Sequence, residues 1–363
     1  MLGGVRVVDA TERLGWLAGR LLGDCGARVT KLEAPGADTS SPHWRALNVN
    51  KHVIRGSAER LPQLAAEADI VLATPSPSQF DELRELLGAN PALVVVSITP
   101  FGMTGPKAGW RGSDLEIMAA GGAMSLAGEP GGMPVRISAP QAYAWAGSQA
   151  AVGALIALSY RRTSGRGQLV DVSAQSAVIT ALSHAPAFVD IAGVSPTRAG
   201  AFMTGRSVTG ARFRVFWPCK DGYLNFILYG GVAGRRTNEQ LVAWMRERGF
   251  DLGALAAQDW AKWDPTIASQ QTIDTMEEPI GRFFLSITKK EFLEGAHARE
   301  MLGYPVSTVA DIAADPQLAA RGFWEDVPAP AGGTERHCGA FVIVDGKRAS
   351  LLTRKSHEYA ASA

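Results

Sequence analysis

The sequence predicts an α/β protein whose larger part is a Rossmann-like, doubly wound domain. Short apolar runs rich in β-branched residues alternate with segments of helical periodicity, as at 68–72, 79–87 and 93–98. Runs that are apolar on both faces are typical of parallel strands covered by helices on either side. In such a domain ligands bind beyond the carboxyl ends of the strands. Any site is therefore expected at that edge.

The elements follow in order from local patterns. Residues 5–9 (Val-Arg-Val-Val-Asp) predict a buried strand, and the leucine spacing in 11–26 predicts a helix. A second strand, 27–33, stops before Pro35-Gly36. The remaining predicted elements of this domain are strands at 68–72, 93–98 and 169–173 and helices at 58–66, 79–87, 147–161 and 174–189.

After about residue 205 the pattern changes to mixed hairpins and helices. Aromatic, β-branched runs at 213–217 and 223–228 flank the turn Lys220-Asp221-Gly222, which predicts a hairpin. We therefore expect a large domain over 1–200, a small α/β domain over 205–310, and a return to the large domain over 311–363. The helices predicted in the small domain are 238–248, 276–285 and 289–298.

The composition favours a cytoplasmic globular protein. There are 36 Lys and Arg against 35 Asp and Glu, so no bulk charge draws the chain to nucleic acid or to an anionic membrane. We expect no membrane span and no signal peptide. Three dispersed cysteines lack metal-ligand spacing, and no metal is expected. The turn after the first strand (residues 9–15, DATERLG) lacks G-x-G-x-x-G, which disfavours a dinucleotide enzyme.

The segment Gly165-Arg166-Gly167-Gln168-Leu169-Val170-Asp171-Val172-Ser173 is the most informative motif. It resembles the "tGrGq-vDvS" signature of family III CoA-transferases, which include α-methylacyl-CoA racemases and were long described as carnitine dehydratases. Further ordered matches extend the resemblance over nearly the whole chain. They are GVRVVD (4–9), the 26–38 segment, NVNK (48–51), FGMTGP (101–106), GSD (112–114), CKDGY (219–223) and YPV (304–306).

The resemblance implies subunits that interlock as rings, CoA thioester substrates and no metal. Family transferases use an Asp nucleophile that forms acyl-aspartyl and aspartyl-CoA intermediates. Tyr143 stands at that Asp position, and Ser113 stands where the racemases have their His. A phenol with a pKa of about 10 is a poor substitute for a carboxylate. The resemblance therefore implies no catalytic residue here, and assigns structural roles to Asp114 and Asp171.

The same resemblance implies a CoA site at the loops beyond the strands. The expected contacts come from the 11–14 segment, including Thr11 and Leu14, and from Ala34, Lys51, Ala73, Thr74 and Arg111. Arg111 and then Lys51 are the expected phosphate ligands. A glycine-rich substrate loop is expected at Gly230, Gly231 and Gly234, with Arg235 and Arg236 beside it as candidates for a substrate carboxylate.

Three functions remain open. In the first, this chain is the non-nucleophilic subunit of a two-subunit CoA-transferase, like the Asp-lacking subunit of the benzylsuccinate type of this family. CoA would move, for example, from succinyl-CoA to an aryl-succinate, with an Asp-bearing paralogue in a heterodimer or heterotetramer. In the second, it is a homodimeric acyl-CoA lyase, isomerase or dehydratase that uses Tyr143, Ser113 or Glu129. In the third, it is a CoA-binding pseudoenzyme.

Overall fold

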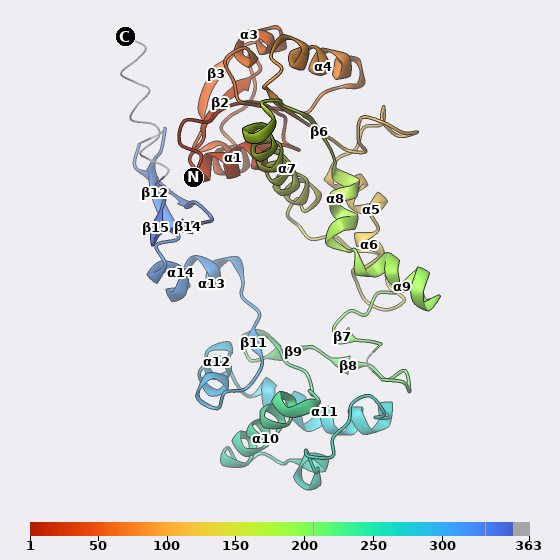
Figure 1. Ribbon diagram of the computed structural model, residues 1–363. Coiled ribbons are helices and arrows are strands. Elements are labelled where there is room, and N and C mark those ends of the chain that lie inside the picture. Colours follow the sequence, from red (N-terminus) through yellow and green to blue (C-terminus); the bar gives the residue numbers. More distant parts are fainter. Residues whose placement is uncertain (206, 331, 351–363) are drawn as a thin grey trace. The chain divides into compact units, whose positions relative to one another are not determined.

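Figure 1 shows the computed structural model, which describes residues 1–205, 207–330 and 332–350. The predicted return of 311–363 to the large domain extends past the described residues at its end. The chain divides into two compact units. The first comprises 1–125, 135–196 and the residues from Asp315 onward, and the second comprises 126–134 and 197–314.

The first unit is built on a six-stranded sheet in the order β3-β2-β1-β4-β5-β6, with every neighbouring pair parallel. This confirms the predicted doubly wound α/β fold. The edge strand β3 was missed because its four residues include His52 and Arg55 and are only partly buried. The strands are β1 (Arg6–Ala10), β2 (Arg28–Glu33), β3 (His52–Arg55), β4 (Ile70–Ala73), β5 (Val94–Thr99) and β6 (Leu169–Ser173).

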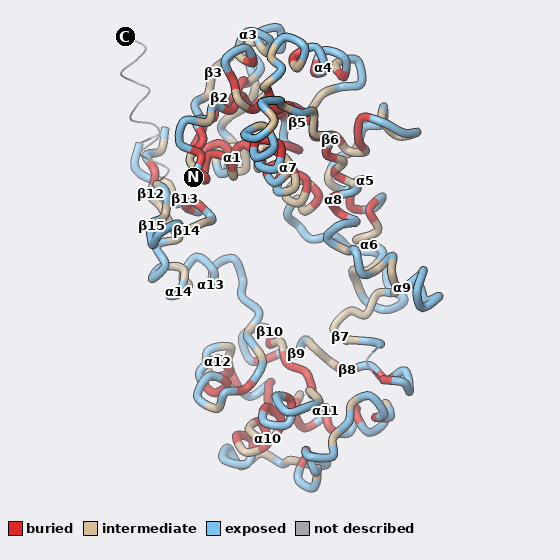
Figure 2. The backbone as a smooth tube through the Cα atoms, in the orientation of Figure 1, coloured by how far each residue is buried: buried red, intermediate tan, exposed pale blue. Residues whose placement is uncertain are grey.

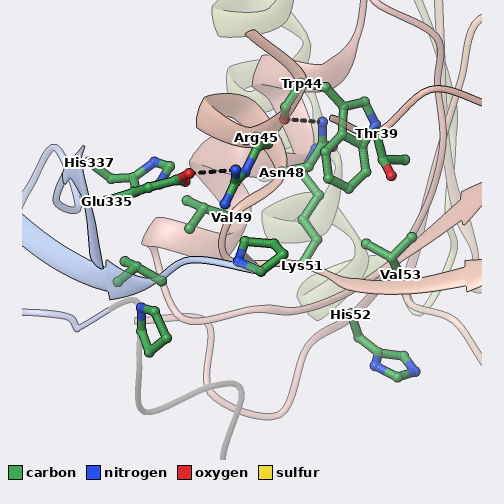
Figure 3. Close-up of a pocket in the computed structure, with 13 residues that line it drawn as sticks. Thr39, Trp44, Arg45, Asn48, Val49, Lys51, His52, Val53, Glu335 and His337 are labelled. Carbon is green, nitrogen blue, oxygen red and sulfur yellow. Dashed lines mark hydrogen bonds and ion pairs between the residues drawn. The ribbon is translucent and has the colours of Figure 1, made fainter. Parts of the chain in front are cut away.

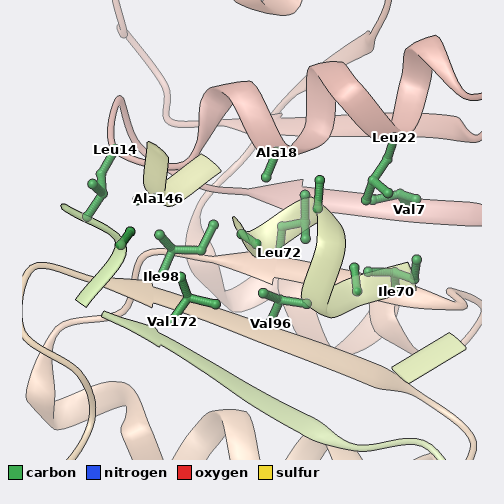
Figure 4. Packing of buried hydrophobic residues seen from close by; sticks show 14 of the residues in the cluster. Val7, Leu14, Ala18, Leu22, Ile70, Leu72, Val96, Ile98, Ala146 and Val172 are labelled. Carbon is green, nitrogen blue, oxygen red and sulfur yellow. The ribbon is translucent and has the colours of Figure 1, made fainter. Parts of the chain in front are cut away.

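Helices cover both faces of this sheet. Alternate strand residues belong to different cores: Val7 packs with the cluster under α1 and α7, whereas Val8 packs with the cluster under α3 and α4. Figure 4 shows the first cluster, and Figure 2 shows buried residues following the strands. The helices of this part are α1 (Trp16–Asp24), α2 (Pro42–Asn48), α3 (Leu61–Ala65), α4 (Phe80–Ala89), α5 (Asp114–Ala120), α6 (Ala123–Leu126), α7 (Ala142–Ser164), α8 (Ala174–Ala181) and α9 (His184–Ala192).

Two predicted helices differ from the structure for local reasons. The first helix begins at Trp16 rather than 11, because Thr11 folds back and donates from its N–H and its hydroxyl to Asp9 Oδ1. The helix predicted over 174–189 is interrupted at Leu182 and Ser183. Pro186 explains the break, since its ring excludes a continuous helix through the carbonyl four residues earlier.

The C-terminal part of the first unit packs against α1 and α2. A hairpin pairs β12 (Trp324–Pro328) with β13 (Thr334–Cys338). Arg20 Nη2 donates to the carbonyl of Cys338 at 2.5 Å, and Arg45 forms an ion pair with Glu335. The remaining elements of this part are α14 (Pro316–Ala320), β14 (Ile343–Val344) and β15 (Lys347–Arg348).

The second unit has an aromatic core. The predicted hairpin is present, with β9 (Phe216–Cys219) antiparallel to β10 (Gly222–Asn225). Trp217, Phe226, Phe284 and Phe292 are fully buried and meet in edge-to-face contacts. The other elements are β7 (Phe202–Met203), β8 (Phe213–Arg214), β11 (Tyr304–Pro305), α10 (Gly231–Glu247), α11 (Gln270–Leu285), α12 (Lys289–Ala298) and α13 (Val309–Ala313), with short 3₁₀ turns at Ala58–Arg60, Pro77–Gln79 and Gly253–Ala257 in the chain as a whole.

A buried carboxyl in α11 should make this unit sensitive to pH. Burial raises the pKa of Glu277 from 4.5 to about 7, although the Arg214 N–H, which donates to Glu277 Oε1 at 2.7 Å, opposes the shift. The folded state therefore holds a proton that the unfolded state has lost between these pH values, so stability falls as pH rises from about 4.5 to about 7.

We expect Glu277→Gln to flatten this dependence, which amounts to about 3 kcal/mol across the window. Urea titrations at pH 5 and pH 8 measure the free energy of unfolding of both proteins. Glu278→Gln is the matched control, because its exposed side chain pairs with Arg282. If the free energy of unfolding of Glu277→Gln depends on pH as that of the unaltered protein does, the Glu277 carboxyl is not the cause of the dependence.

Within the described part of the chain, no helix has the length and apolar character needed to cross a bilayer. The same part contains no group of three or more His, Cys, Asp or Glu side chains placed to hold a metal ion.

Candidate functional site

The segments expected to contact CoA meet at one edge of the sheet. Thr11 follows β1, Ala34 follows β2 and Thr74 follows β4, and these three strands are neighbours in the sheet. Thr74 Oγ1 accepts a hydrogen bond from the N–H of Glu12 at 2.7 Å, which ties the loops after β1 and β4 together. The loops therefore form one continuous carboxyl edge, where a doubly wound sheet binds its ligands.

Several of the expected contact residues are buried beneath this edge. Thr11, Leu14 and Ala73 are all less than a tenth exposed. The Thr11 hydroxyl is bonded to Asp9, and its carbonyl accepts from Lys31 Nζ at 2.6 Å. These three side chains shape the loops and are not exposed to a ligand at this edge.

Lys51 is held in a buried network and is not free to bind phosphate, contrary to our expectation. Its Nζ donates to Asp9 Oδ2 at 2.6 Å, to the Trp16 carbonyl at 2.7 Å and to Asn48 Oδ1 at 2.8 Å. All three ammonium donors therefore have protein partners. Burial lowers the pKa of Lys51 to about 8, while Asp9 opposes that shift. Burial alone would raise the pKa of Asp9, but the charges of Lys51 and Lys31 outweigh it and hold that pKa below its usual value.

Replacing Lys51 by Met is expected to lower the free energy of unfolding by about 3–5 kcal/mol, because Asp9 keeps a buried charge without its nearest cation. The double variant Asp9→Asn/Lys51→Met should recover part of that loss. Urea titration measures both. Lys262→Met, which changes a side chain 86% exposed, is the control. Equal losses in the free energy of unfolding for Lys51→Met and Lys262→Met would show that the Asp9–Lys51 pair does not stabilise the fold.

Arg111 keeps the phosphate role as a proposal. It is exposed in the loop before α5, and it forms no hydrogen bond or ion pair with the residues that the structure describes. Its guanidinium is therefore available to an anion.

The Tyr143 region is ordered by the start of two helices. Tyr143 is the second residue of α7, and its N–H donates to Asp114 Oδ1 at 3.3 Å. Ser113 caps α5, and both its N–H and its hydroxyl donate to Glu116. The structure thus brings Tyr143 and Ser113, the two positions with altered catalytic residues, to neighbouring helix starts.

These contacts decide the chemistry of the region. Burial raises the pKa of the half-buried Tyr143 hydroxyl, so the phenol stays protonated near neutral pH. The Ser113 hydroxyl is engaged by Glu116, and Asp114 supports the backbone of α7. Asp171 likewise accepts the N–H of Met103 at 2.9 Å. These contacts support the structural roles expected of Asp114 and Asp171. They leave no activated nucleophile among Tyr143, Ser113, Asp114 and Asp171.

The glycines of the most informative motif have structural roles. Gly165 ends α7 in the left-handed conformation with φ +69°. An added Cβ on Gly167 would lie 1.7 Å from the carbonyl oxygen of Leu93. The motif therefore marks the place where the chain leaves α7 and passes close to the start of β5 before it enters β6.

The predicted substrate loop is not a loop in this structure. Gly230 is the N-cap of α10, and Gly231 and Gly234 lie in its first turn. Arg235 pairs with Glu239, and Arg236 pairs with Glu300, so both guanidiniums have protein partners. Gly230 and Gly231 still line a shallow hollow of about 520 Å³ with residues 261–266. Two of the candidate catalytic residues lie in different units. Glu129 belongs to the second unit, whereas Tyr143 belongs to the first.

A cavity of about 510 Å³ lies in the first unit between α2, β3 and the β12–β13 hairpin (Figure 3). Trp44, His52 and His337 line it, together with the Arg45–Glu335 ion pair. Of the residues expected to contact CoA, only Lys51 reaches this cavity. Local sequence patterns do not reveal it, because its walls come from segments almost 300 residues apart.

Arg13 is the residue of the site that the sequence did not single out. It is exposed within the 11–14 segment, and its charge acts on both Tyr143 and His43. It lies in the 11–14 segment that was expected to contact CoA, and in this fold the loops that follow the strands lie at the ligand edge.

The chain is similar to known CoA-transferases over nearly its whole length. The model of CoA-transferase family III matches residues 2–354. The sequence is 33% identical over 352 residues to succinyl-CoA:(R)-benzylsuccinate CoA-transferase subunit BbsE of Thauera aromatica, covering 88% of this chain and 82% of the relative. It is 28% identical over 355 residues to the succinyl-CoA–L-malate CoA-transferase alpha subunit of Chloroflexus aurantiacus, covering 88% of this chain and 77% of that protein.

A solved structure shares the fold along nearly the whole chain. A CAIB/BAIF family protein from Brucella suis matches with a TM-score of 0.79 and 26% identity, covering 96% of this chain and 94% of the other. The family match and the 33% identity extend across both units. This chain belongs to CoA-transferase family III.

Proposed function

We propose that this chain is the non-nucleophilic subunit of a heteromeric CoA-transferase of family III. A paralogous partner chain supplies the catalytic Asp, and CoA moves between carboxylic acids, for example from succinyl-CoA to an aryl-succinate. The two chains interlock in a heterodimer or heterotetramer in the cytoplasm. Without the partner, this chain forms a homodimer.

The observation that supports this proposal most strongly is Tyr143 at the nucleophile position. CoA transfer through an enzyme-bound acyl group needs an intermediate that is activated in both directions, as an anhydride and then a thioester are. A protonated phenol attacks a thioester poorly, and an aryl ester is less activated than an anhydride. The raised pKa of Tyr143 increases this disadvantage.

The contacts of the neighbouring groups support the same conclusion. Asp114 is the carboxylate that contacts Tyr143, but it accepts the backbone N–H at the start of α7. Glu116 is bonded to Ser113. A replacement nucleophile would have to give up a helix-supporting contact.

The names of two relatives support the proposal of a partner subunit. Both BbsE and the malate CoA-transferase alpha subunit are named as subunits of CoA-transferases that act on succinyl-CoA. The proposal that this chain works with an unlike subunit follows from these names together with Tyr143. The carboxyl edge and Arg111 are our candidates for the CoA contact.

Co-expression with an Asp-bearing paralogue tests the proposal. We expect purified complex to transfer CoA from succinyl-CoA to an aryl-succinate, and each chain alone to be inactive or nearly so. Transfer by this chain alone would overturn the proposal. Conversion of an acyl-CoA by the isolated chain would support a lyase, isomerase or dehydratase instead, and a fully active lone partner would favour a CoA-binding pseudoenzyme.

A further inference from the structure

Two arginines of the second unit contact one aromatic ring. Arg212 and Arg214 flank Phe213, whose side chain is fully buried, so both arginines point to the opposite, outer face of the extended chain. Phe202 on β7 is the cross-strand partner of Arg214 on β8. The guanidinium carbons of Arg212 and Arg214 lie 4.7 Å and 4.8 Å from the centroid of the Phe202 ring. The two cations are therefore separated by less than twice the longer of these distances.

Neither guanidinium is neutralised by a carboxylate of the described chain. The side chains of Arg212 and Arg214 form no hydrogen bond or ion pair with any residue in 1–205, 207–330 and 332–350. Two carboxyl groups of α11 are engaged elsewhere. Glu277 Oε1 accepts the backbone N–H of Arg214 at 2.7 Å, and Asp274 Oδ1 accepts from Gln270 at 2.7 Å. Two like charges held this close repel each other, and an external anion would relieve that repulsion.

The backbone beneath the two arginines is fixed to α11. Gln270 Oε1 accepts the N–H of Arg212 at 2.9 Å, and Gln270 Nε2 donates to the carbonyl of Arg212 at 3.2 Å. Glu277 holds the backbone N–H of Arg214 from the same face of the helix, two turns further along. The fold itself therefore sets the positions from which both side chains project.

The aromatic contacts hold the guanidiniums without using their hydrogen-bond donors. Arg214 also lies over the buried Trp217, 5.5 Å from the centroid of its ring. A ring attracts a guanidinium through its charge and accepts no conventional hydrogen bond from it, so the N–H donors stay open to a ligand. Arg212 is exposed and Arg214 is partly exposed, so an anion in solvent can reach both. Guanidinium forks bind carboxylate and phosphate oxygens in pairs, and two such forks beside one ring match an anion with two negative charges.

We propose that Arg212, Arg214 and Phe202 form a binding site for a compact divalent anion on the second unit, whereas the residues expected to contact CoA belong to the first. Both guanidiniums donate to the anion, and the Phe202 ring holds the two cations beside each other. Two sources carry this chemistry, a short dicarboxylic acid and a phosphate group. No bond forms or breaks. The inference goes beyond the proposed function and does not depend on it, because the site uses this chain alone.

Fluorine NMR of the full chain labelled with 4-fluorophenylalanine tests the proposal. The protein has 13 Phe residues, and the resonance lost in Phe202→Leu identifies Phe202. Sodium succinate and sodium phosphate are the two probes, and sodium chloride at matched ionic strength controls for salt. We expect at least one of the two divalent anions to shift the Phe202 resonance saturably. Arg212→Gln should weaken that binding about tenfold or more, as for loss of a charge-assisted hydrogen bond.

Arg246→Gln is the matched control. Arg246 is exposed in the last turn of α10, and its guanidinium likewise forms no hydrogen bond or ion pair with the described residues. This variant should bind the probes as the unaltered protein does. Arg212→Gln is the decisive variant, because the Arg212 side chain is exposed and Gln270 bonds only to its backbone, so the fold should not require that side chain. The fluorine spectrum without ligand checks that each variant is folded.

The two probes separate the sources of the ligand. Tighter binding of succinate would identify a dicarboxylic acid, and tighter binding of phosphate would identify a phosphate group. Sodium acetate, which carries one charge, should bind about tenfold more weakly than the preferred probe because it engages one guanidinium. The proposal is overturned if neither probe moves the Phe202 resonance, if chloride or acetate moves it equally, or if Arg212→Gln binds as tightly as Arg246→Gln.

Discussion

Replacing Gly167 by Ala is expected to destabilise the first unit by more than about 3 kcal/mol, because it overpacks rigid backbone. The added Cβ would lie 1.7 Å from the carbonyl oxygen of Leu93 and 2.3 Å from its carbonyl carbon. Neither atom can rotate away as a side chain could. The Gly167 N–H also donates to the Pro91 carbonyl at 2.8 Å, so this segment cannot shift without loss of that bond.

Gly88→Ala is the matched control. Gly88 lies within α4, and an added Cβ there meets no atom within 4 Å. We expect a gain of up to about 1 kcal/mol, since Ala favours the helix over Gly. Urea titration followed by tryptophan fluorescence compares the two variants. Similar free energies of unfolding for both would show that the close approach at Gly167 is not required.

Under the proposed function, removing the catalytic carboxylate of the partner chain is expected to reduce CoA transfer by the complex by several orders of magnitude. The reason is that Tyr143 offers a protonated phenol at the equivalent place and cannot take over nucleophilic attack. An Asp→Asn variant of the partner keeps the shape of the side chain and removes its charge. Initial rates with succinyl-CoA and an aryl-succinate measure the effect.

The control for this loss is assembly. Sedimentation should show that the Asp→Asn partner still associates with this chain, so that any loss of rate is chemical. If the complex keeps most of its activity, a group on this chain must perform the chemistry. Glu116 and Asp114 would then be the first candidates to examine, because they are the carboxylates that act on Tyr143.

The strands of the first unit could be predicted because their signals are local. Buried runs such as 70–73 and 94–99 are apolar on both faces, and period and length identify them without tertiary information. The edge strand β3 has no such run. The first turn of α10 was predicted as a loop because its glycines disfavour a helix, yet packing of the following turns carries the helix back to Gly231.

The sequence predicted where the candidate site lies, but not which contacts its residues make. The resemblance located Tyr143 and the strand-end loops, which the structure places along one edge. It also suggested that Lys51 would bind phosphate, whereas Lys51 pairs with Asp9, 42 positions away in the sequence. Only the folded chain shows which cations are already paired. Arg13 and Arg111 are unpaired among the described residues, and local patterns do not distinguish them from Lys51.

Under the proposed function, the acyl group is never attached to this chain. The most direct test incubates the co-expressed complex with succinyl-CoA, traps activated acyl groups with hydroxylamine, and identifies the modified chain by peptide mass spectrometry. We predict a hydroxamate at the Asp of the partner and none on any carboxylate of this chain. A stoichiometric adduct on this chain, at any residue, would show that this chain itself carries the acyl group and would overturn the proposed function.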